Sequence, residues 1–308
     1  MTEAIASIRC GDDLRGRVPG AFFPIADPVC QGPVHGEFPE DYVSRRAGFV
    51  AGHYAHGVAG VRARLAGEYA ALRELPQYGR VLLWFEHDLW DQAALIRVLS
   101  VLAAWPALAG RLWLVPPDGV RGFAEMPQAE LEAIEAEPLP WSAVEAGAEA
   151  WDAFASDDPT ALDRLTRRAL PLPHLARAMR RHLQDLPWVT DGLSLTERLV
   201  MRAAAEGITE EGPMLRHLRA ADPVFHLTDL ILRDVVGRLS TGTRRLLARE
   251  APHAPTPRGA AILAGEARHS PGPRHQAGVV VGPRGRWWWN PRSAGVTDRL
   301  PGRPGLFG

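Results

Sequence analysis

Residues 81–99, VLLWFEHDLWDQAALIRVL, decide the fold because they join a buried strand to a helix through a charged corner. The apolar run over residues 81–85 is typical of a strand, and a helical pattern begins at about Asp91. The corner between them consists of Glu86, His87 and Asp88. Burying ionisable side chains at such a point costs free energy unless they form ion pairs or take part in binding or catalysis. Because ligands of open α/β sheets bind at the carboxyl ends of strands, the stretch predicts a site.

Three further apolar runs predict strands on either side of this stretch. They are Ile5 to Cys10, Phe22 to Ala26 and Arg111 to Val115, with a helical region from about Tyr42 to Leu75. Strands that alternate with helices predict an α/β fold, here a small, mostly parallel, Rossmann-like sheet. The first two strands are too close in sequence for a helical crossover, so their mutual orientation stays open.

The remaining chain has a helical pattern from 126 to 190 and a winged-helix-like profile from 191 to 290. That profile is three helices, a short strand, a turn and a further helix, and it opens with a capping box at Ser194-Leu-Thr-Glu197. Residues 279–281 and 287–289 predict a hairpin around Gly-Pro-Arg-Gly-Arg. Four parts are therefore expected: an α/β domain (1–125), a helical connector (126–190), the winged-helix-like domain (191–290) and a disordered Pro/Gly/Arg-rich tail (291–308).

The composition excludes several classes of protein. The 308 residues carry a formal net charge of −1 and are 46% hydrophobic, so no global charge favours nucleic acid or an anionic membrane. Residues 190–308 nevertheless hold 17 Arg against 11 Asp and Glu. Two cysteines are too few for a disulfide framework. With no signal-peptide pattern and no apolar run of ~20 residues, we expect a cytoplasmic protein without a membrane partner.

The strand ends supply the candidate site residues. We expect Glu86, His87 and Asp88 to be catalytic, and the ligand-binding candidates are Asp12, Asp13, Asp27 and Gln31. His87 would be the general acid or base, and Glu86 its orienting carboxylate or a metal ligand. Specifically, Asp12, Asp27, Glu86 and His87 are predicted to line one pocket. Other roles remain open: Asp88 can be a helix N-cap, and Asp12 and Asp13 can belong to a turn.

No standard cofactor motif narrows the chemistry. The chain has no GxxxxGK[ST] phosphate loop, no GxGxxG after a strand and no GxSxG nucleophile elbow. Typical ATPase, dinucleotide oxidoreductase and serine hydrolase functions are therefore disfavoured. The cofactor, the metal content and the oligomeric state stay open at this point.

Several segments share one resemblance: LWFEHDLWDQ, Gly11-Asp12, Asp27 to Val34 and Arg46 to Phe49, and later DAFASDDPTAL, the RRHLQDLP-to-GLSLTER stretch and PTPRGAAILAGE. They resemble a bacterial family built on domain of unknown function 1835 with a companion C-terminal domain of unknown function 3658. It covers about residues 5 to 290 and implies a two-part bacterial protein, without an established reaction.

The chain departs from the family pattern near its beginning. Arg9-Cys10 precedes Gly11-Asp12 where the family has Asn, and Gln31 stands where it has Glu. The usual Trp-Arg before Asp27 is replaced by Pro24-Ile25-Ala26. The resemblance therefore implies that an acidic ligand and an arginine are missing from the family's site, so altered substrate or lost activity is implied as an alternative.

Two functions follow from these patterns. The first is an enzyme, or an enzyme-derived domain, that binds a small polar ligand, possibly phosphorylated or a nucleotide. The alternative is a ligand-sensing transcriptional regulator with a winged-helix DNA-binding domain. Its recognition helix would span about residues 227–239, where Arg233 and Arg238 are interrupted by Asp229 and Asp234. Any binding to nucleic acid is therefore expected to be weak and non-specific.

Overall fold

The computed structural model describes residues 4–54, 57–119 and 121–300. It contains a five-stranded sheet in the order β2-β1-β3-β4-β5. The strands are β1 (Ile5–Arg9), β2 (Ala21–Pro24), β3 (Arg80–Trp84), β4 (Leu112–Leu114) and β5 (Glu137–Pro138). The first four are parallel and only β5 is antiparallel, which confirms the expected mostly parallel α/β sheet.

The orientation of β1 and β2, left open by the sequence, is parallel, with Ala6 opposite Ala21. A loop of about ten residues makes this connection in place of a helix, and it buries Leu14 completely against the sheet. Gly20 ends the loop at φ +79°, where an added Cβ would lie 2.1 Å from the Ile5 carbonyl oxygen. The short parallel return is thus possible because a glycine lets the chain pass this close to β1.

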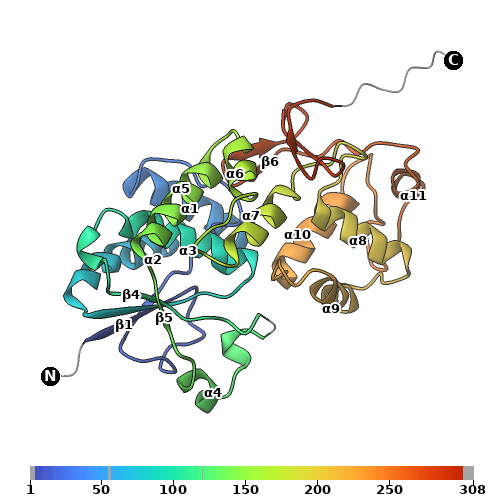
Figure 1. Ribbon diagram of the computed structural model, residues 1–308. Helices are drawn as coiled ribbons and strands as arrows, with labels where there is room; N and C mark the ends of the chain where they lie inside the picture. Colours follow the sequence, from blue (N-terminus) through green and yellow to red (C-terminus); the bar gives the residue numbers. More distant parts are fainter. Residues whose placement is uncertain (1–3, 55–56, 120, 301–308) are drawn as a thin grey trace.

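The two faces of the sheet are covered differently (Figure 1). Val81 and Leu83 of β3 pack into the large core under the helices, while Leu82 and Trp84 face a smaller cluster with Leu14. The helical layer consists of α1 (Glu40–Tyr54), α2 (Val58–Ala71), α3 (Leu89–Leu102), α5 (Trp141–Ala155), α6 (Thr160–Leu165) and α7 (Leu175–Leu183). The short helix α4 (Gln128–Glu132) lies on the opposite face. Short 3-10 turns occur at Leu72–Gln77, Pro106–Leu108 and Phe123–Glu125.

Residues 126–190 complete the α/β part and do not form a separate connector. Strand β5 extends the same sheet, and α5 and α7 both pack against α3. The approach of α5 to α3 is very close, since a Cβ on Gly147 would lie 2.5 Å from a methyl carbon of Leu99. The predicted boundary at residue 125 therefore falls inside one packed unit.

The C-terminal part contains three successive helices and a short fourth one. These are α8 (Leu195–Ala205), α9 (Glu211–Ala221), α10 (Asp229–Ser240) and α11 (Pro257–Leu263). The capping box is confirmed: the Ser194 amide donates to Glu197 at 2.9 Å, and the Glu197 amide donates to the Ser194 hydroxyl at 3.2 Å. The winged-helix assignment is not confirmed, because the strands that follow form two small separate hairpins.

These hairpins correct two predictions. Strand β7 (Val279–Val281) pairs with β6 (Arg274–Gln276), and β8 (Trp288–Asn290) pairs with β9 (Gly295–Thr297), so the expected hairpin of 279–281 with 287–289 is wrong. The predicted disorder is also wrong for residues 291–297, because pairing with β8 orders them despite their Pro/Gly/Arg-rich composition. Residues 301–308 of the predicted tail lie outside the described residues. Within the described ranges, no helix is both long and apolar enough to cross a bilayer.

Candidate functional site

Arg9 is the centre of the charged cluster at the strand ends. It is the last residue of β1, pairs in register with Trp84 of β3, and is 5% exposed. Its Nη2 lies 2.7 Å from Glu86 Oε1, and its Nε and Nη2 bind the two carboxylate oxygens of Asp13 at 3.0 Å each. Its Nη1 forms an ion pair with Asp91. The connections after β1 and β3 leave toward opposite faces of the sheet, and ligands of such sheets ordinarily bind between two strands of this kind. Here the Arg9 guanidinium occupies that position.

The carboxyl groups of this cluster have raised pKa values. Burial, with the neighbouring Asp91 charge, raises the pKa of Glu86, and burial raises the pKa values of Asp88 and Asp91 to about 6. Asp88 is the N-cap of α3 and accepts hydrogen bonds from the amides of Trp90 and Asp91 at 2.7 and 3.1 Å. The local interpretation of Asp88 as a helix cap is therefore confirmed, and its catalytic role stays a prediction.

The structure does not pair His87 with Glu86. The Glu86 carboxylate receives Arg9 and the Phe123 amide, the latter at 2.9 Å. His87 is half-buried, and its Nδ1 is buried without a hydrogen-bond partner among the described residues. Its ring lies 6.0 Å from the His174 ring, whose pKa is lowered by burial and by His87. Among the described residues, Glu86 therefore forms no hydrogen bond with His87 Nδ1.

Asp27 lies in a separate, fully buried network under the helical layer. Its carboxylate accepts hydrogen bonds from Arg46 Nε at 2.8 Å and from the hydroxyls of Tyr42 and Tyr69 at 2.8 and 2.9 Å. Both Asp27 and Arg46 have side chains that are 0% exposed. Arg46 also donates to the backbone carbonyls of Pro28, Gln31 and Pro33. Asp27 therefore fixes the loop after β2 and has no oxygen facing a ligand.

The predicted single pocket of Asp12, Asp27, Glu86 and His87 is not formed. Asp12 has a side chain that is 65% exposed and pairs with Arg15, whereas Asp13 joins the Arg9 cluster. Asp27 is enclosed in its own network. The structure thus brings Asp13 and Glu86 together around Arg9 and separates the others. The sequence analysis assigned no site role to Arg9 or Arg46. For Arg9 one signal was present, namely a cationic residue at the end of a mainly apolar strand, immediately before Cys-Gly-Asp-Asp.

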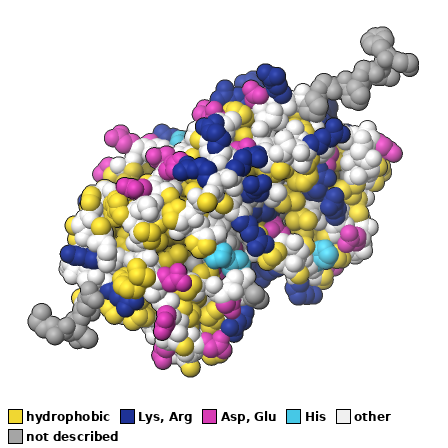
Figure 2. Space-filling view, viewed as in Figure 1, with side chains coloured by type: hydrophobic (Ala, Val, Ile, Leu, Met, Phe, Trp, Pro, Cys, Tyr) yellow, Lys and Arg dark blue, Asp and Glu magenta, His cyan; other side chains and the backbone are white. Residues whose placement is uncertain are grey.

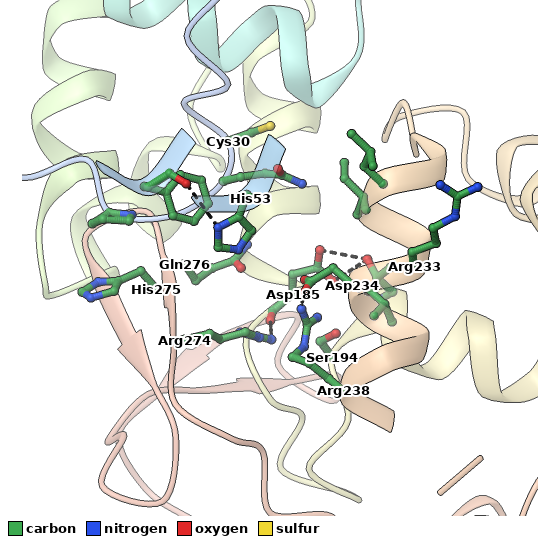
Figure 3. Close-up of a pocket in the computed structure, with 18 of the residues that line it drawn as sticks. Cys30, His53, Asp185, Ser194, Arg233, Asp234, Arg238, Arg274, His275 and Gln276 are labelled. Atoms are coloured by element: carbon green, nitrogen blue, oxygen red, sulfur yellow. Dashed lines mark hydrogen bonds and ion pairs between the residues drawn. The ribbon is translucent and has the colours of Figure 1, made fainter. Parts of the chain in front are cut away.

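Gln31, the remaining ligand-binding candidate, lines a cleft of about 720 Å³ at the same edge of the sheet. The cleft lies between the α/β part, the face of α10 and strand β6 (Figure 3). Cys30 and Gln31 follow β2, and Leu89 begins α3 after β3. Phe49, Phe225 and Ile231 add apolar walls, and Ser194 and Gln276 add polar groups. This is a cavity of the size and mixed lining that small organic ligands occupy.

Among the described arginines that line the cleft, one guanidinium forms no ion pair with a carboxylate. Arg233 pairs with Glu211 at 3.0 Å, and Arg238 pairs with Asp234 of the same helix. In Figure 3, Arg274 extends from β6 toward Asp185; its Nη2 donates to the Asp185 carbonyl at 2.8 Å. Its Nη1 is buried and has no hydrogen-bond partner within the described ranges. Burial lowers the pKa of Arg274, which marks a cation held without full compensation.

The same contacts do not favour the DNA-binding alternative. Helix α10 stands where the recognition helix was predicted, yet its residues Ile231, Asp234 and Arg238 line the cleft toward the α/β part. Its two arginines already pair with carboxylates. Figure 2 shows arginine side chains gathered over α7 and toward α10, on the face seen in Figure 1. A helix that faces its own chain offers little surface to a DNA groove.

His182 lies beside the cleft and provides a pH-dependent contribution to stability. Its Nδ1 is 3.3 Å from the Gln276 amide nitrogen, and its ring packs on Phe154 with centroids 4.5 Å apart. Burial lowers the pKa of His182 to about 3. The folded protein therefore keeps this imidazole neutral throughout the mildly acidic range.

We expect His182→Gln to remove part of the acid sensitivity of the fold. As pH falls below about 6.5, the unfolded chain protonates His182 and the folded chain does not, so folding stability is lost. Between pH 7.5 and 5 this group lowers the free energy of unfolding of the parent protein by about 2 kcal/mol. Urea unfolding at both pH values measures the difference, and equal pH dependence of parent and variant would contradict it.

The described residues hold no group of three or more His, Cys, Asp or Glu side chains placed to bind a metal ion. Both cysteines are buried and unpaired, and burial raises the pKa of each thiol, which makes thiolate chemistry unfavourable at neutral pH. Comparison of the sequence with protein-family models and with curated proteins found no match. The resemblance to the family with domain of unknown function 1835 therefore stays a prediction, carried by the segments quoted above.

Proposed function

We propose that this protein binds a small phosphorylated metabolite in the cleft between α10, β6 and the carboxyl edge of the sheet. The observation that carries the proposal is Arg274, whose Nη1 is buried in this cleft without a hydrogen-bond partner. A phosphate or carboxylate oxygen would supply the charge-assisted hydrogen bond that this atom lacks. The position at the strand ends supports the same conclusion, since α/β sheets bind ligands there.

The remaining lining residues fit an organic body attached to that anion. Phe49 and Phe225 offer aromatic surface, and Gln31 and Gln276 offer amide groups for orientation. A cavity near 720 Å³ accommodates a molecule of nucleotide size. The cleft is lined by Arg233, Arg238 and Arg274 against Asp185 and Asp234, and this excess of positive charge favours an anion over a cation.

Acid–base chemistry at His87 is a second candidate function. Its support is the buried Nδ1 without a partner, next to the neutral His174 ring. A buried imidazole nitrogen that has no hydrogen-bond partner is suited to accept or donate a proton when a substrate binds.

Thermal unfolding with matched probes tests both candidates. The probes are adenosine and guanosine monophosphate and ribose 5-phosphate, with adenosine, guanosine and ribose as uncharged partners. We expect a phosphate-bearing probe to raise Tm, because a ligand at a hundredfold its Kd stabilises the native state by about 2.7 kcal/mol. Arg274→Met should abolish the shift. The matched variant Arg233→Met, at an exposed and paired arginine of the same cleft, should retain it.

Three outcomes of this experiment are informative. An equal shift in the parent and in Arg274→Met, or no shift with any phosphorylated probe, contradicts the proposed cleft site. A shift that survives Arg274→Met and disappears in His87→Ala favours the second candidate. Among the described residues, the Arg274 side chain makes one hydrogen bond, to the Asp185 carbonyl, so replacing this side chain is not expected to unfold the chain.

A further inference from the structure

A second cavity, of about 630 Å³, lies at the other end of the helical layer. The cleft contacts the end of α1 and the beginning of α3, whereas this cavity contacts the beginning of α1 and the end of α3. Its walls also include α2 and Trp151 of α5. It is thus distinct from the site proposed above and shares no lining residue with it.

Arg97 lies in this cavity enclosed by aromatic rings. It is 4% exposed, and its guanidinium carbon lies 4.1 to 5.1 Å from four ring centroids, those of Phe38, Tyr42, Trp151 and Tyr69. Its Nη1 contacts the Ser100 hydroxyl at 3.4 Å, and it forms no ion pair with a described carboxylate. The rings stabilise the cation through cation–π attraction, which does not replace a hydrogen-bond acceptor for its N–H groups.

The unpartnered atoms of Arg97 form one side of the guanidinium. Nε and Nη2 are both buried without a hydrogen-bond partner in the described part of the chain. These two nitrogens make the edge that binds a carboxylate with two parallel hydrogen bonds. Arg9 uses this same edge on Asp13, with Nε–Oδ1 and Nη2–Oδ2 distances of 3.0 Å each. Arg97 therefore presents the donor pair of a carboxylate site without a carboxylate.

The cage around Arg97 is held in place by the Asp27 network. The hydroxyls of Tyr42 and Tyr69 both donate to Asp27, and their rings meet edge to face at 5.8 Å. Phe38, which precedes α1, is 36% exposed and is the outermost ring. The rings of Tyr42 and Tyr69 are therefore held in place by Asp27, and Phe38 is the ring that an entering molecule would displace.

The rim of the cavity adds positive charge. Arg62 and Arg73 line it and form no ion pair with any residue that the structure describes, whereas the acidic lining residues are Glu40 and Asp152. Trp105 supplies a further aromatic surface. Three arginines against two carboxylates favour an anion, and the rings favour a flat apolar body.

From this arrangement we infer that the cavity is a binding site for a small aromatic carboxylate. The carboxylate receives Arg97 Nε and Nη2, and the aromatic body lies among Phe38, Trp105 and Trp151. The inference does not depend on the function proposed for the cleft, because no residue is shared between the two cavities.

Calorimetric titration with benzoate tests the site, with the neutral isostere benzamide as the matched probe. We expect benzoate to bind at least about tenfold more tightly than benzamide, and Arg97→Met to weaken benzoate binding at least about tenfold. Arg97→Lys retains the charge and removes the two-nitrogen edge, so it should weaken benzoate binding even where Arg97→Met does not fold. Arg80→Met is the control, since Arg80 also stacks on an indole, that of Trp113, 4.0 Å away but outside this cavity.

The outcomes separate this site from the cleft. Arg274→Met should leave benzoate binding unchanged. Equal affinity for benzoate and benzamide, equal affinity of the parent and Arg97→Lys, or no benzoate binding by the parent up to about 10 mM, the range of weak fragments, would overturn the inference.

Discussion

Asp27→Ala is expected to lower the free energy of unfolding by about 3–5 kcal/mol, because it leaves the Arg46 guanidinium buried without its counter-ion. Arg46 is 0% exposed, and Asp27 receives both its Nε and its Nη2. The substitution also strands the hydroxyls of Tyr42 and Tyr69, which both donate to Asp27. Urea unfolding at pH 7.5 measures the change.

A matched control is available on α1, the helix that carries Arg46. Asp41 pairs with Arg45 at 2.8 Å, a distance close to that of Asp27 and Arg46, but these side chains are 45% and 49% exposed. Asp41→Ala should therefore have a much smaller effect, since water and salt screen exposed pairs. Comparable losses in the two variants would show that burial of the Asp27 pair is not what makes it important.

Arg9→Met is expected to have a loss of similar size, about 3–5 kcal/mol at pH 7.5, because it leaves several buried carboxyl groups without a counter-ion. Arg9 is shared by Asp13, Glu86 and Asp91. Burial already raises the pKa values of Glu86 and Asp91 in the intact protein, and removal of the cation raises them further. Raised carboxyl pKa values mean that the folded variant takes up protons as the pH falls, so part of the loss should be recovered at pH 5.

The comparison with Arg15→Met makes this prediction specific. Arg15 follows in the same loop and pairs with Asp12, but its side chain is 56% exposed, so its removal should cost under about 1 kcal/mol. Urea unfolding of both variants at pH 7.5 and pH 5 gives the required four values. A deficit of Arg9→Met that is the same at both pH values would contradict the assignment of the buried carboxyl groups as its cause.

The sequence predicted the fold correctly where the signal comes from residues close to one another in the chain. The stretch after Val81 predicted a strand, a corner and a helix, and β3 and α3 lie there, with Asp88 as the N-cap. The capping box at Ser194 likewise predicted the beginning of α8. Hydrophobic periodicity and capping depend on residues a few positions apart, so they can be recognised in the sequence itself.

Prediction of the site was less successful because polar groups at the strand ends were treated as available to a ligand. Glu86 instead pairs with Arg9, 77 residues earlier in the chain, and Asp27 pairs with Arg46 across the loop after β2. Gln31 does line a cleft, but the most informative residue of that cleft, Arg274, lies in β6, a strand that the sequence analysis did not predict.

The sequence by itself determined the four parallel strands of the sheet, most of the helices and the edge of the sheet where polar residues gather. Only the tertiary structure decided which charges neutralise one another and which arginines keep unused donors. The physical reason is that a charge is paired or left over according to what packing brings within about 3 Å of it, and the order of strands and layers is a property of the whole chain. Arg9 and Arg46 end with partners, whereas Arg97 and Arg274 end buried with donors unpaired.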